Sequence, residues 1–536
     1  MADKYPMAEA VRAAYRAGEE DEALEPLARV DEQGRPVGSI RDGDYVIFYD
    51  IRGEREVELT SAFVDPGFSA FPRRPMTVRF ATMIEYHPEL DVRVAFPPLE
   101  RLEGTLCEVV GRAGLSQAKV CESEKAIHVS FFLNGKSQDA FPGEERVVVP
   151  SPRPASHTEM PPQMSAAAVA GAAIEAIRRR DHALVMVNLC NVDVIGHIEN
   201  PDAIRSAVET VDAQAGRIVE AAMAAGMSIV VTADHGTVER WYYPDGAIDT
   251  GHTDSPVPFL LIDPHLGQGA RLRDGGALTD VAPTILELLG LPKPAVMTGT
   301  SLVIPPLPAG EPALDRSEGR AGARVLLLVL DGWGIGDGGR GDLIAQAETP
   351  VMDSLSAEWP TTSLQAAGRA VGMPEGTVGN SEAGHLHIGA GRIVPADRVR
   401  ISQALEDGSF FENEAFRWAM QGAKRAGTRL HLLGIVSFYS SHGSVDHLLA
   451  LMEMARREGV PEVYMHSMLG RRGERPESGA IYIEQVEREA ERLGTGTLAT
   501  VIGRFWSLDR EGHWDRIAKT YRMLVEGAGK PIPDLA

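Results

Sequence analysis

Short apolar runs recur along the whole chain, and most are followed by a polar loop and an amphipathic stretch. Runs that lack polar alternation are typical of strands buried on both faces, as in parallel sheets covered by helices. We therefore predict an α/β protein with parallel-type sheets flanked by helices. The predicted strands are 45–51, 183–189, 227–233, 258–263, 324–330, 430–436 and 462–468, and helical patterns include 163–179, 201–225, 445–458 and 482–493.

One stretch interrupts this alternation. Residues 304–323 show no hydrophobic period and are dominated by Pro, Gly, Ala and charged residues. That composition is typical of a linker. Because the chain has 536 residues, we expect two or three domains.

Acidic residues outnumber basic ones, with 76 Asp and Glu against 53 Lys and Arg and a formal net charge of -23. This balance argues against nucleic acid or an anionic membrane as a partner, since both need a basic face. A local cluster of arginines could still bind a small anionic substrate. The three cysteines lack metal-type spacing, and the chain has no apolar signal region and no apolar window of 18 residues. We therefore expect a cytoplasmic protein with reduced thiols.

The apolar run at 324–330 leads directly into Asp331, within the segment VLLLVLDGWG. In open α/β sheets, functional residues gather where strands end and loops begin. An isolated Asp-Gly is also a common turn. Asp331 considered alone could therefore be either a functional-site residue or an ordinary turn residue.

Acids and histidines follow other predicted strands as well. Asp193 and His197 are spaced i, i+4 after 183–189, which places both on one face of a helix. Asp234 and His235 follow 227–233, and His252 precedes 258–263. Adjacent residues point apart, so Asp234 and His235 could serve neighbouring ions. Mixed carboxylate and imidazole ligands suit Mn²⁺ or Zn²⁺, and two such ions would stabilise the oxygens of a phosphoryl transfer.

A glycine-rich segment at 370–394 contains Gly379-Asn380-Ser381-Glu382. This pattern is typical of a helix start with an N-cap. Backbone N–H groups at such a start can hold a phosphate, although a capped helix alone would show the same pattern. A metal can bind serine as its alkoxide, so Ser381 is a candidate nucleophile and could share an ion with Asp331.

These segments resemble the cofactor-independent (2,3-bisphosphoglycerate-independent) phosphoglycerate mutase family of the alkaline phosphatase superfamily. The resemblance covers nearly the whole chain and rests on long motifs. They include VLDGWG, AVGMPEGTVGNSEAGHLHIGAGRIV, ALEDGSFFEN, CESEKAIHVSFFLNG, SPRPASHTEMPPQMSA, NVDVIGH, TADHG and GHTDSPVP. In the family VLDGWG opens the chain, whereas here it follows the DHG half. The resemblance therefore implies a circular permutation, in which 304–323 joins the family's usual termini.

The resemblance implies an alkaline-phosphatase-like metal domain and a second α/β domain that binds substrate. It places the metal domain at 109–396 and divides the substrate-binding domain between 1–108 and 397–536. It also implies a monomer that binds two divalent ions, with Mn²⁺ expected and Zn²⁺, Co²⁺ or Mg²⁺ as alternatives. One ion would be held by Asp193, His197 and His252, and the other by Asp331, Ser381, Asp234 and His235.

By the same resemblance, Ser381 would take the phosphoryl group of a small phosphorylated substrate and return it to another hydroxyl of the same glycerate. Lys125 would lie beside that group, and His442 and Arg472 would act with them. The substrate-binding residues implied are Arg52, Arg55, Arg504, Arg510, His442 and Arg472.

Two motifs depart from the family pattern. SFYSSHGS, at 437–444, keeps His442 but replaces an aspartate, two glycines and a second histidine. GRRG, at 470–473, keeps Arg472 but has Gly473 where the family has an aspartate that helps to move the protons of substrate hydroxyls. A positioned base contributes about 10²–10⁴-fold to such a step, so this loss should slow a mutase unless another group replaces it.

Three functions remain open. The first is an isomerase that interconverts 3-phosphoglycerate and 2-phosphoglycerate, or a close analogue, through a phosphoserine. The second is a paralogue that transfers or hydrolyses a phosphoryl or phosphonyl group on a phosphonate-type glycerate in specialised metabolism. The third is a non-catalytic descendant, against which the full set of metal ligands argues.

Overall fold

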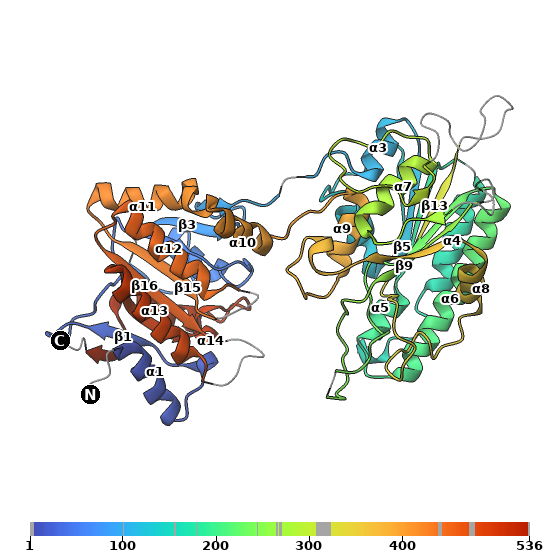
Figure 1. The fold of residues 1–536 in the computed structure, drawn as a ribbon. Helices are drawn as coiled ribbons and strands as arrows, with labels where there is room; N and C mark the ends of the chain where they lie inside the picture. Colours follow the sequence, from blue (N-terminus) through green and yellow to red (C-terminus); the bar gives the residue numbers. More distant parts are fainter. Residues whose placement is uncertain are drawn as a thin grey trace. The chain divides into compact units, whose positions relative to one another are not determined.

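The computed structural model describes residues 5–74, 76–99, 101–154, 157–179, 181–243, 245–263, 266, 271–306, 323–437, 442–470 and 477–533. The chain forms two compact units (Figure 1). The first unit comprises Met1–Pro98 and Arg400–Ala536, and the second comprises Leu99–Val399. Most of the expected linker, at 307–322, lies outside the described residues.

The division near residue 100 differs from the boundary expected at 108/109. That boundary would cut helix α3 (Leu106–Arg112), whose Leu106, Cys107 and Val110 are buried in the core of the second unit. The other division falls at 399/400, three residues beyond the expected 396/397. The chain therefore changes units in the loop before α3, not within the helix.

The described residues of the first unit form an eight-stranded sheet in the order β18-β1-β17-β16-β15-β2-β3-β4. The strands from β17 to β4 are parallel to their neighbours, whereas β1 runs antiparallel to β17 and parallel to β18. The strands are β1 Leu27–Val30, β2 Tyr45–Phe48, β3 Arg79–Ile84, β4 Arg93–Phe96, β15 Leu430–Ile435, β16 Val463–Leu469, β17 Thr497–Gly503 and β18 Lys530–Pro533.

The helices of the first unit bury an apolar side against this sheet. The helix α11 contacts β2 and β3, α12 contacts β15, and α13 contacts β17. Each of these three helices ends at a glycine in the left-handed conformation. The helices are α1 Pro6–Arg16, α2 Val57–Val64, α10 Asp397–Asp407, α11 Glu414–Ala426, α12 Val445–Glu458, α13 Gly479–Leu493, α14 Arg504–Ser507 and α15 Trp514–Glu526.

The described residues of the second unit form another eight-stranded sheet, in the order β11-β14-β9-β8-β13-β7-β5-β6. The strands are β5 Gln117–Glu122, β6 Glu144–Val149, β7 Leu184–Leu189, β8 Ser228–Thr232, β9 Val257–Ile262, β11 Gly276–Ala277, β13 Val325–Leu330 and β14 Thr361–Gln365. A separate pair consists of β10 Arg271–Leu272 and β12 Val303–Ile304.

The strand β13 lies between β7 and β8 and is parallel to both. All six of its residues are buried, as its unbroken apolar pattern predicts. The parallel expectation is wrong for β9, which runs antiparallel to β8 and to β14. The carboxyl ends of β7, β13 and β8 consequently meet at one edge of the sheet.

Two groups of helices cover this sheet. The helices α4 and α6 contact each other and the strands, and α8 packs on α6. The helices α3, α7 and α9 contact one another and lie on the other side of the sheet in Figure 1. The helices are α4 Ala166–Arg179, α5 Asn191–Gly196, α6 Pro201–Ala224, α7 Val281–Leu288, α8 Pro350–Glu358 and α9 Ser381–Ala390. Among the described residues, no helix combines the length and apolar character that a membrane crossing requires.

Candidate metal centre

Asp331 lies at the carboxyl end of β13 and is fully buried. The next residue, Gly332, has a φ of 84°, which side-chain-bearing residues rarely adopt. A Cβ at Gly332 would lie 2.7 Å from the backbone nitrogen of Asp193, which donates to the carbonyl of Asp331 at 3.1 Å. The glycine therefore lets the loop after β13 approach the loop after β7 closely.

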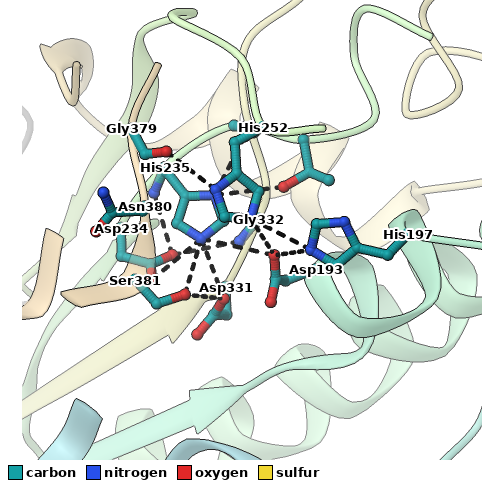
Figure 2. A network of polar contacts seen from close by, with 12 residues as sticks. Asp193, His197, Asp234, His235, His252, Asp331, Gly332, Gly379, Asn380 and Ser381 are labelled. Carbon is teal, nitrogen blue, oxygen red and sulfur yellow. Dashed lines mark hydrogen bonds and ion pairs between the residues drawn. The ribbon is translucent and has the colours of Figure 1, made fainter. Parts of the chain in front are cut away.

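Asp193, His197 and His252 form one group of possible metal ligands, with their donor atoms within 4.8 Å of one another (Figure 2). Asp193 lies on α5, and His197 follows one turn later, as the i, i+4 spacing predicts. His252 Nε2 lies 3.1 Å from Asp193 Oδ1 and 3.3 Å from His197 Nε2. The other ring nitrogens of His252 and His197 contact the carbonyl oxygens of Gly379 and Thr250, which fixes both rings.

Asp234 and His235 follow β8 and are fully buried. They belong to different groups of possible ligands, one formed by His235 with Asp193 and Asp331 and the other by Asp234 with Asp331 and His385. This arrangement agrees with the expectation that adjacent residues point toward neighbouring positions. Asp331 is common to both groups, so it could bridge them.

Ser381 is the first residue of α9, and the side chain of Asn380 caps that helix by accepting from the Ala383 N–H. The expected N-cap at this position is therefore present. Ser381 Oγ lies 2.9 Å from His235 Nε2 and 3.4 Å from Asp331 Oδ1. The hydroxyl thus lies among the possible metal ligands, at the N-terminus of a helix (Figure 2).

The ammonium of Lys125 contacts three of these residues. It donates to Asp193 Oδ2 at 2.7 Å, to Asp331 Oδ1 at 2.8 Å and to Ser381 Oγ at 2.5 Å. These contacts use all three donors of an ammonium group. Lys125 therefore lies next to the candidate nucleophile.

The cluster contains more carboxylate groups than ammonium groups. Burial alone would lower the pKa of Lys125, but Asp331 and Asp193 raise it well above the usual lysine value. Burial would raise the pKa of Asp193, but Lys125 holds it well below its usual range. Burial and the neighbouring Asp234 raise the pKa of Asp331. One ammonium thus faces three buried carboxylates, an arrangement that favours bound cations.

The donor set fits divalent ions. Carboxylate and imidazole donors in overlapping groups are the ligands that Mn²⁺ and Zn²⁺ accept. Asp234 Oδ2 is buried and accepts no well-aligned hydrogen bond within the described residues, although the His385 ring nitrogen Nδ1 lies 3.2 Å away. A buried carboxylate oxygen of this kind needs a cation or a donor, so the cluster can hold divalent metal.

Two further residues support the cluster, and no sequence pattern described above singled them out. Asn188, on β7, donates to Asp331 Oδ2 at 2.7 Å and lies 3.1 Å from His385 Nε2. His385 Nδ1 lies 3.2 Å from Asp234 Oδ2 and 2.9 Å from the carbonyl oxygen of Ser381. His385 occurs in the quoted GNSEAGHLH motif, where its position one turn after Ser381 could have identified it.

The expected substrate-binding residues lie in the first unit. Arg52 Nε lies 3.9 Å from Glu54 Oε2, and Arg510 also contacts that carboxylate. Arg55 donates to the carbonyl of Leu508 at 3.0 Å. These contacts place Arg510 beside the segment that contains Arg52 and Arg55.

Arg504 follows β17 directly, is 9% exposed, and lies 3.4 Å from Glu22 Oε1. His442 is buried, and its Nδ1 lies 3.1 Å from Glu56 Oε1. Arg472 lies outside the described residues. The described residues of this set therefore follow the carboxyl ends of parallel strands, where ligands bind in open α/β sheets.

Comparison with protein families gives two matches. The model of the metalloenzyme superfamily matches residues 43–293. The model described as the BPG-independent PGAM N-terminus matches residues 401–534. The chain is similar to BPG-independent phosphoglycerate mutases. The two matches extend over parts of both units.

Curated relatives agree with these matches. The chain is 43% identical over 304 residues to a 2,3-bisphosphoglycerate-independent phosphoglycerate mutase of Thermomicrobium roseum, over 56% of this chain and 58% of that protein. It is 42% identical over 298 residues to that of Moorella thermoacetica, over 55% and 57%. For the enzyme of Synechococcus sp. the identity is 44% over 275 residues, covering 50% and 52%. The chain thus spans little more than half the length of the curated relatives it matches.

A solved structure of Leishmania mexicana phosphoglycerate mutase is also similar in sequence. The identity is 32%, covering 51% of this chain and 53% of that chain, with a TM-score of 0.37.

Proposed function

We propose that the protein is a metal-dependent isomerase that interconverts 3-phosphoglycerate and 2-phosphoglycerate through a phosphoserine at Ser381. The observation that carries this proposal is the position of Ser381 Oγ, within contact distance of Lys125 and His235 and at the start of α9. The curated relatives named above are phosphoglycerate mutases, which supports the same substrate.

Residues of the second unit would act on the Ser381 hydroxyl and on the phosphoryl group in different ways. Lys125 and the N-terminus of α9 bring positive charge to the Ser381 hydroxyl, where an incoming phosphoryl group would also be bound. His235 orients the same hydroxyl. The clustered carboxylates and imidazoles would hold divalent ions, and such ions, when bound, would supply Lewis acidity for phosphoryl transfer at Ser381. Mn²⁺ is the ion we propose for this donor set, in a monomeric protein.

In the first unit, Arg52, Arg55, Arg504 and Arg510 are proposed to bind the carboxylate and phosphate groups of the glycerate. Arginine suits this role because its planar guanidinium binds such groups through two parallel hydrogen bonds. Substitution of Arg504 by Lys should raise KM for phosphoglycerate more than it lowers kcat if the residue binds substrate.

A second candidate function is transfer or hydrolysis on a phosphonate-type glycerate. Gly473 and the SFYSSHGS segment at 437–444 favour it, because both depart from the mutase pattern. A side-by-side assay separates the two. Faster turnover of phosphoglycerate than of its phosphonate analogues supports the mutase, and release of inorganic phosphate without isomerisation supports a hydrolase.

We also propose that the chain is circularly permuted. The model described as the BPG-independent PGAM N-terminus matches residues 401–534, which follow the metalloenzyme match at 43–293 in the sequence. A segment described as N-terminal thus lies in the C-terminal part of this chain. The strands β18 and β1 pair in parallel, and α1, which precedes β1, contacts β18. A linker from the end of β18 to the start of α1 would therefore complete a β–α–β crossover within the first unit. A gene opened within 307–322 and closed by such a linker should give a folded protein with the same turnover. An insoluble or inactive product would count against the permutation.

The proposed function is tested by Ser381→Ala in the metal-loaded enzyme. Wild-type protein incubated with 3-phosphoglycerate should gain a phosphoryl group on the peptide that contains Ser381, detected by mass spectrometry, and the variant should not. Mutase activity without any phosphoserine would contradict the proposal.

A further inference from the structure

Glu239 is a buried carboxylate in the loop after β8, and nothing above gives it a role. It follows the candidate ligand His235 by one helical-turn length of sequence and is 2% exposed. Its Oε2 accepts the N–H of Thr237 at 2.9 Å, and its Oε1 accepts the hydroxyl of Thr253. Both donors are neutral groups. A buried carboxylate that meets neutral donors is costly, so Glu239 needs a reason other than stability.

The two threonines that bind Glu239 belong to segments that carry candidate metal ligands. Thr237 Oγ1 lies 3.3 Å from His235 Nδ1. Thr253 directly follows His252 in the chain. The ring centroids of His235 and His252 lie 4.1 Å apart. Because one carboxylate binds both threonines, it joins the segment of His235 to the segment of His252.

Thr253 also connects these segments to the candidate nucleophile. Its carbonyl accepts the N–H of Gly379 at 3.0 Å. The carbonyl oxygen of Gly379 lies 3.0 Å from His252 Nδ1 (Figure 2). Gly379 lies two residues before Ser381, just ahead of α9. A shift of Thr253 would therefore move a metal ligand and the start of the nucleophile helix together.

Close packing confines the carboxylate of Glu239. A Cβ at Gly334, in the loop after β13, would lie 2.3 Å from Glu239 Cδ. A Cβ at Gly236 would lie 2.4 Å from Glu239 Oε1. The two glycines therefore leave the space that the carboxylate occupies. Gly334 follows Asp331 by three residues, so the carboxylate also lies against a third segment that carries a ligand.

We propose that Glu239 is a positioning residue that sets the spacing of His235, His252 and the start of α9. It acts through its two threonine partners, which contact or adjoin these groups. The proposal rests on the metal-binding part of the proposed function and does not depend on the substrate. Residues behind metal ligands typically contribute about 10–100-fold to metal affinity.

The first test is the metal affinity of Glu239→Gln. The amide offers one oxygen, so it can accept from only one of the two threonines. Its NH₂ group should face the hydroxyl of Thr253, which can accept, because the N–H of Thr237 can only donate. The contact from the Thr253 hydroxyl to residue 239 is then lost. Mn²⁺ affinity in calorimetric titration should fall by about 10–100-fold.

Asp212→Asn is the matched control in the second unit. Asp212 is also buried and accepts two neutral donors, the N–H groups of Val351 and Met352 at 3.1 and 2.8 Å. These donors belong to the first turn of α8, which carries none of the candidate ligands. This variant should bind Mn²⁺ as wild type does. Equal losses of affinity in the two variants, or no loss for Glu239→Gln, would overturn the proposal.

A second test asks whether Glu239 acts through Thr253. Thr253→Val removes the hydroxyl and leaves the backbone contacts to Gly236 and Gly379 in place. Each single variant should lose Mn²⁺ affinity. The double variant should lose about as much as one single variant, because both substitutions remove the same contact. Losses that multiply would overturn the proposal, since the two residues would then act separately.

Bound Co²⁺ gives a readout that a role in stability alone would not change. The visible absorption of Co²⁺ depends on the geometry of its ligands. The Co²⁺ bands of Glu239→Gln should differ from those of wild type in position or intensity, whereas Asp212→Asn should give the wild-type spectrum. Wild-type bands in Glu239→Gln would overturn the proposal, because its ligands would then be correctly placed.

These measurements distinguish failure of this proposal from failure of the proposed function, since none of them uses phosphoglycerate. Wild-type protein that binds Mn²⁺ but converts no phosphoglycerate would refute the proposed function, and the variants would still test Glu239. Wild-type protein that binds neither Mn²⁺ nor Co²⁺ would overturn both.

Discussion

Lys125→Met should destabilise the metal-free protein strongly. The Lys125 side chain is 5% exposed, and its ammonium contacts Asp193 and Asp331 at 2.7 and 2.8 Å. Removing one partner of a buried ion pair costs about 3–5 kcal/mol, because the carboxylates that remain are buried and unpaired. For a domain of this size about 1 kcal/mol corresponds to about 2–4 °C, so the melting temperature of the second unit should fall by about 6–20 °C.

Bound metal should change this result. Cations on the same carboxylates replace the missing positive charge, so the loss measured in Mn²⁺ should be much smaller than in chelator. Differential scanning calorimetry of wild type and Lys125→Met under both conditions measures the difference. Lys293→Met is the control, since its ammonium donates to the carbonyls of Met297 and Gly299 and its effect should not depend on metal. A loss for Lys125→Met that is the same with and without Mn²⁺ would refute the reasoning.

Three further predictions follow from the geometry. Ser381→Ala should abolish mutase turnover and should lower the melting temperature by less than Lys125→Met does in chelator, since the hydrogen bond that the buried hydroxyl accepts from an ammonium contributes about 1.5–3 kcal/mol. Residual turnover above one-hundredth of wild type, in a steady-state assay, would argue for another nucleophile. Gly332→Ala should weaken Mn²⁺ binding by about 10–100-fold in calorimetric titration, because its Cβ would displace Asp193, which lies 2.7 Å away. Gly226→Ala, at a similar φ but with nothing within 4 Å, should bind normally, and equal affinities of the two variants would contradict the argument. Burial lowers the pKa of His431 and of His466, so the folded first unit keeps both neutral, while the unfolded chain takes up protons below about pH 6.5. Stability should therefore fall as pH decreases through that value, and His466→Gln should flatten the fall in melting temperature; an unchanged slope would disprove the linkage.

Much of the metal centre follows from the sequence, because each ligand lies at or near the end of an apolar strand. Asp331, Asp193 and Asp234 follow β13, β7 and β8, and parallel strands bring their carboxyl ends to one edge. The antiparallel direction of β9 could not be predicted from the sequence, because a pattern of apolar residues does not show in which direction a strand runs. The role of Asn188 could not be predicted either, because its partner, Asp331, is distant in the sequence.

The close packing of Asp50, Glu56 and His442, whose ligand-type atoms lie within 4.8 Å of one another, could not be predicted for a different reason. The segment DIRGERE contains five charged residues and reads as an exposed loop. Asp50 and Glu56 are nevertheless fully buried, and Asp50 lies against β15 at Gly434, a contact that only the tertiary structure reveals. The unit boundary near residue 100 was similarly hidden, because α3 packs into the second unit through contacts remote in sequence.

The most direct test of the central claim is ³¹P NMR of the purified, Mn²⁺-loaded protein with 3-phosphoglycerate. A growing 2-phosphoglycerate signal, absent in Ser381→Ala, is the predicted result. A spectrum that stays unchanged with metal-replete protein would contradict the claim that this site is a phosphoglycerate mutase.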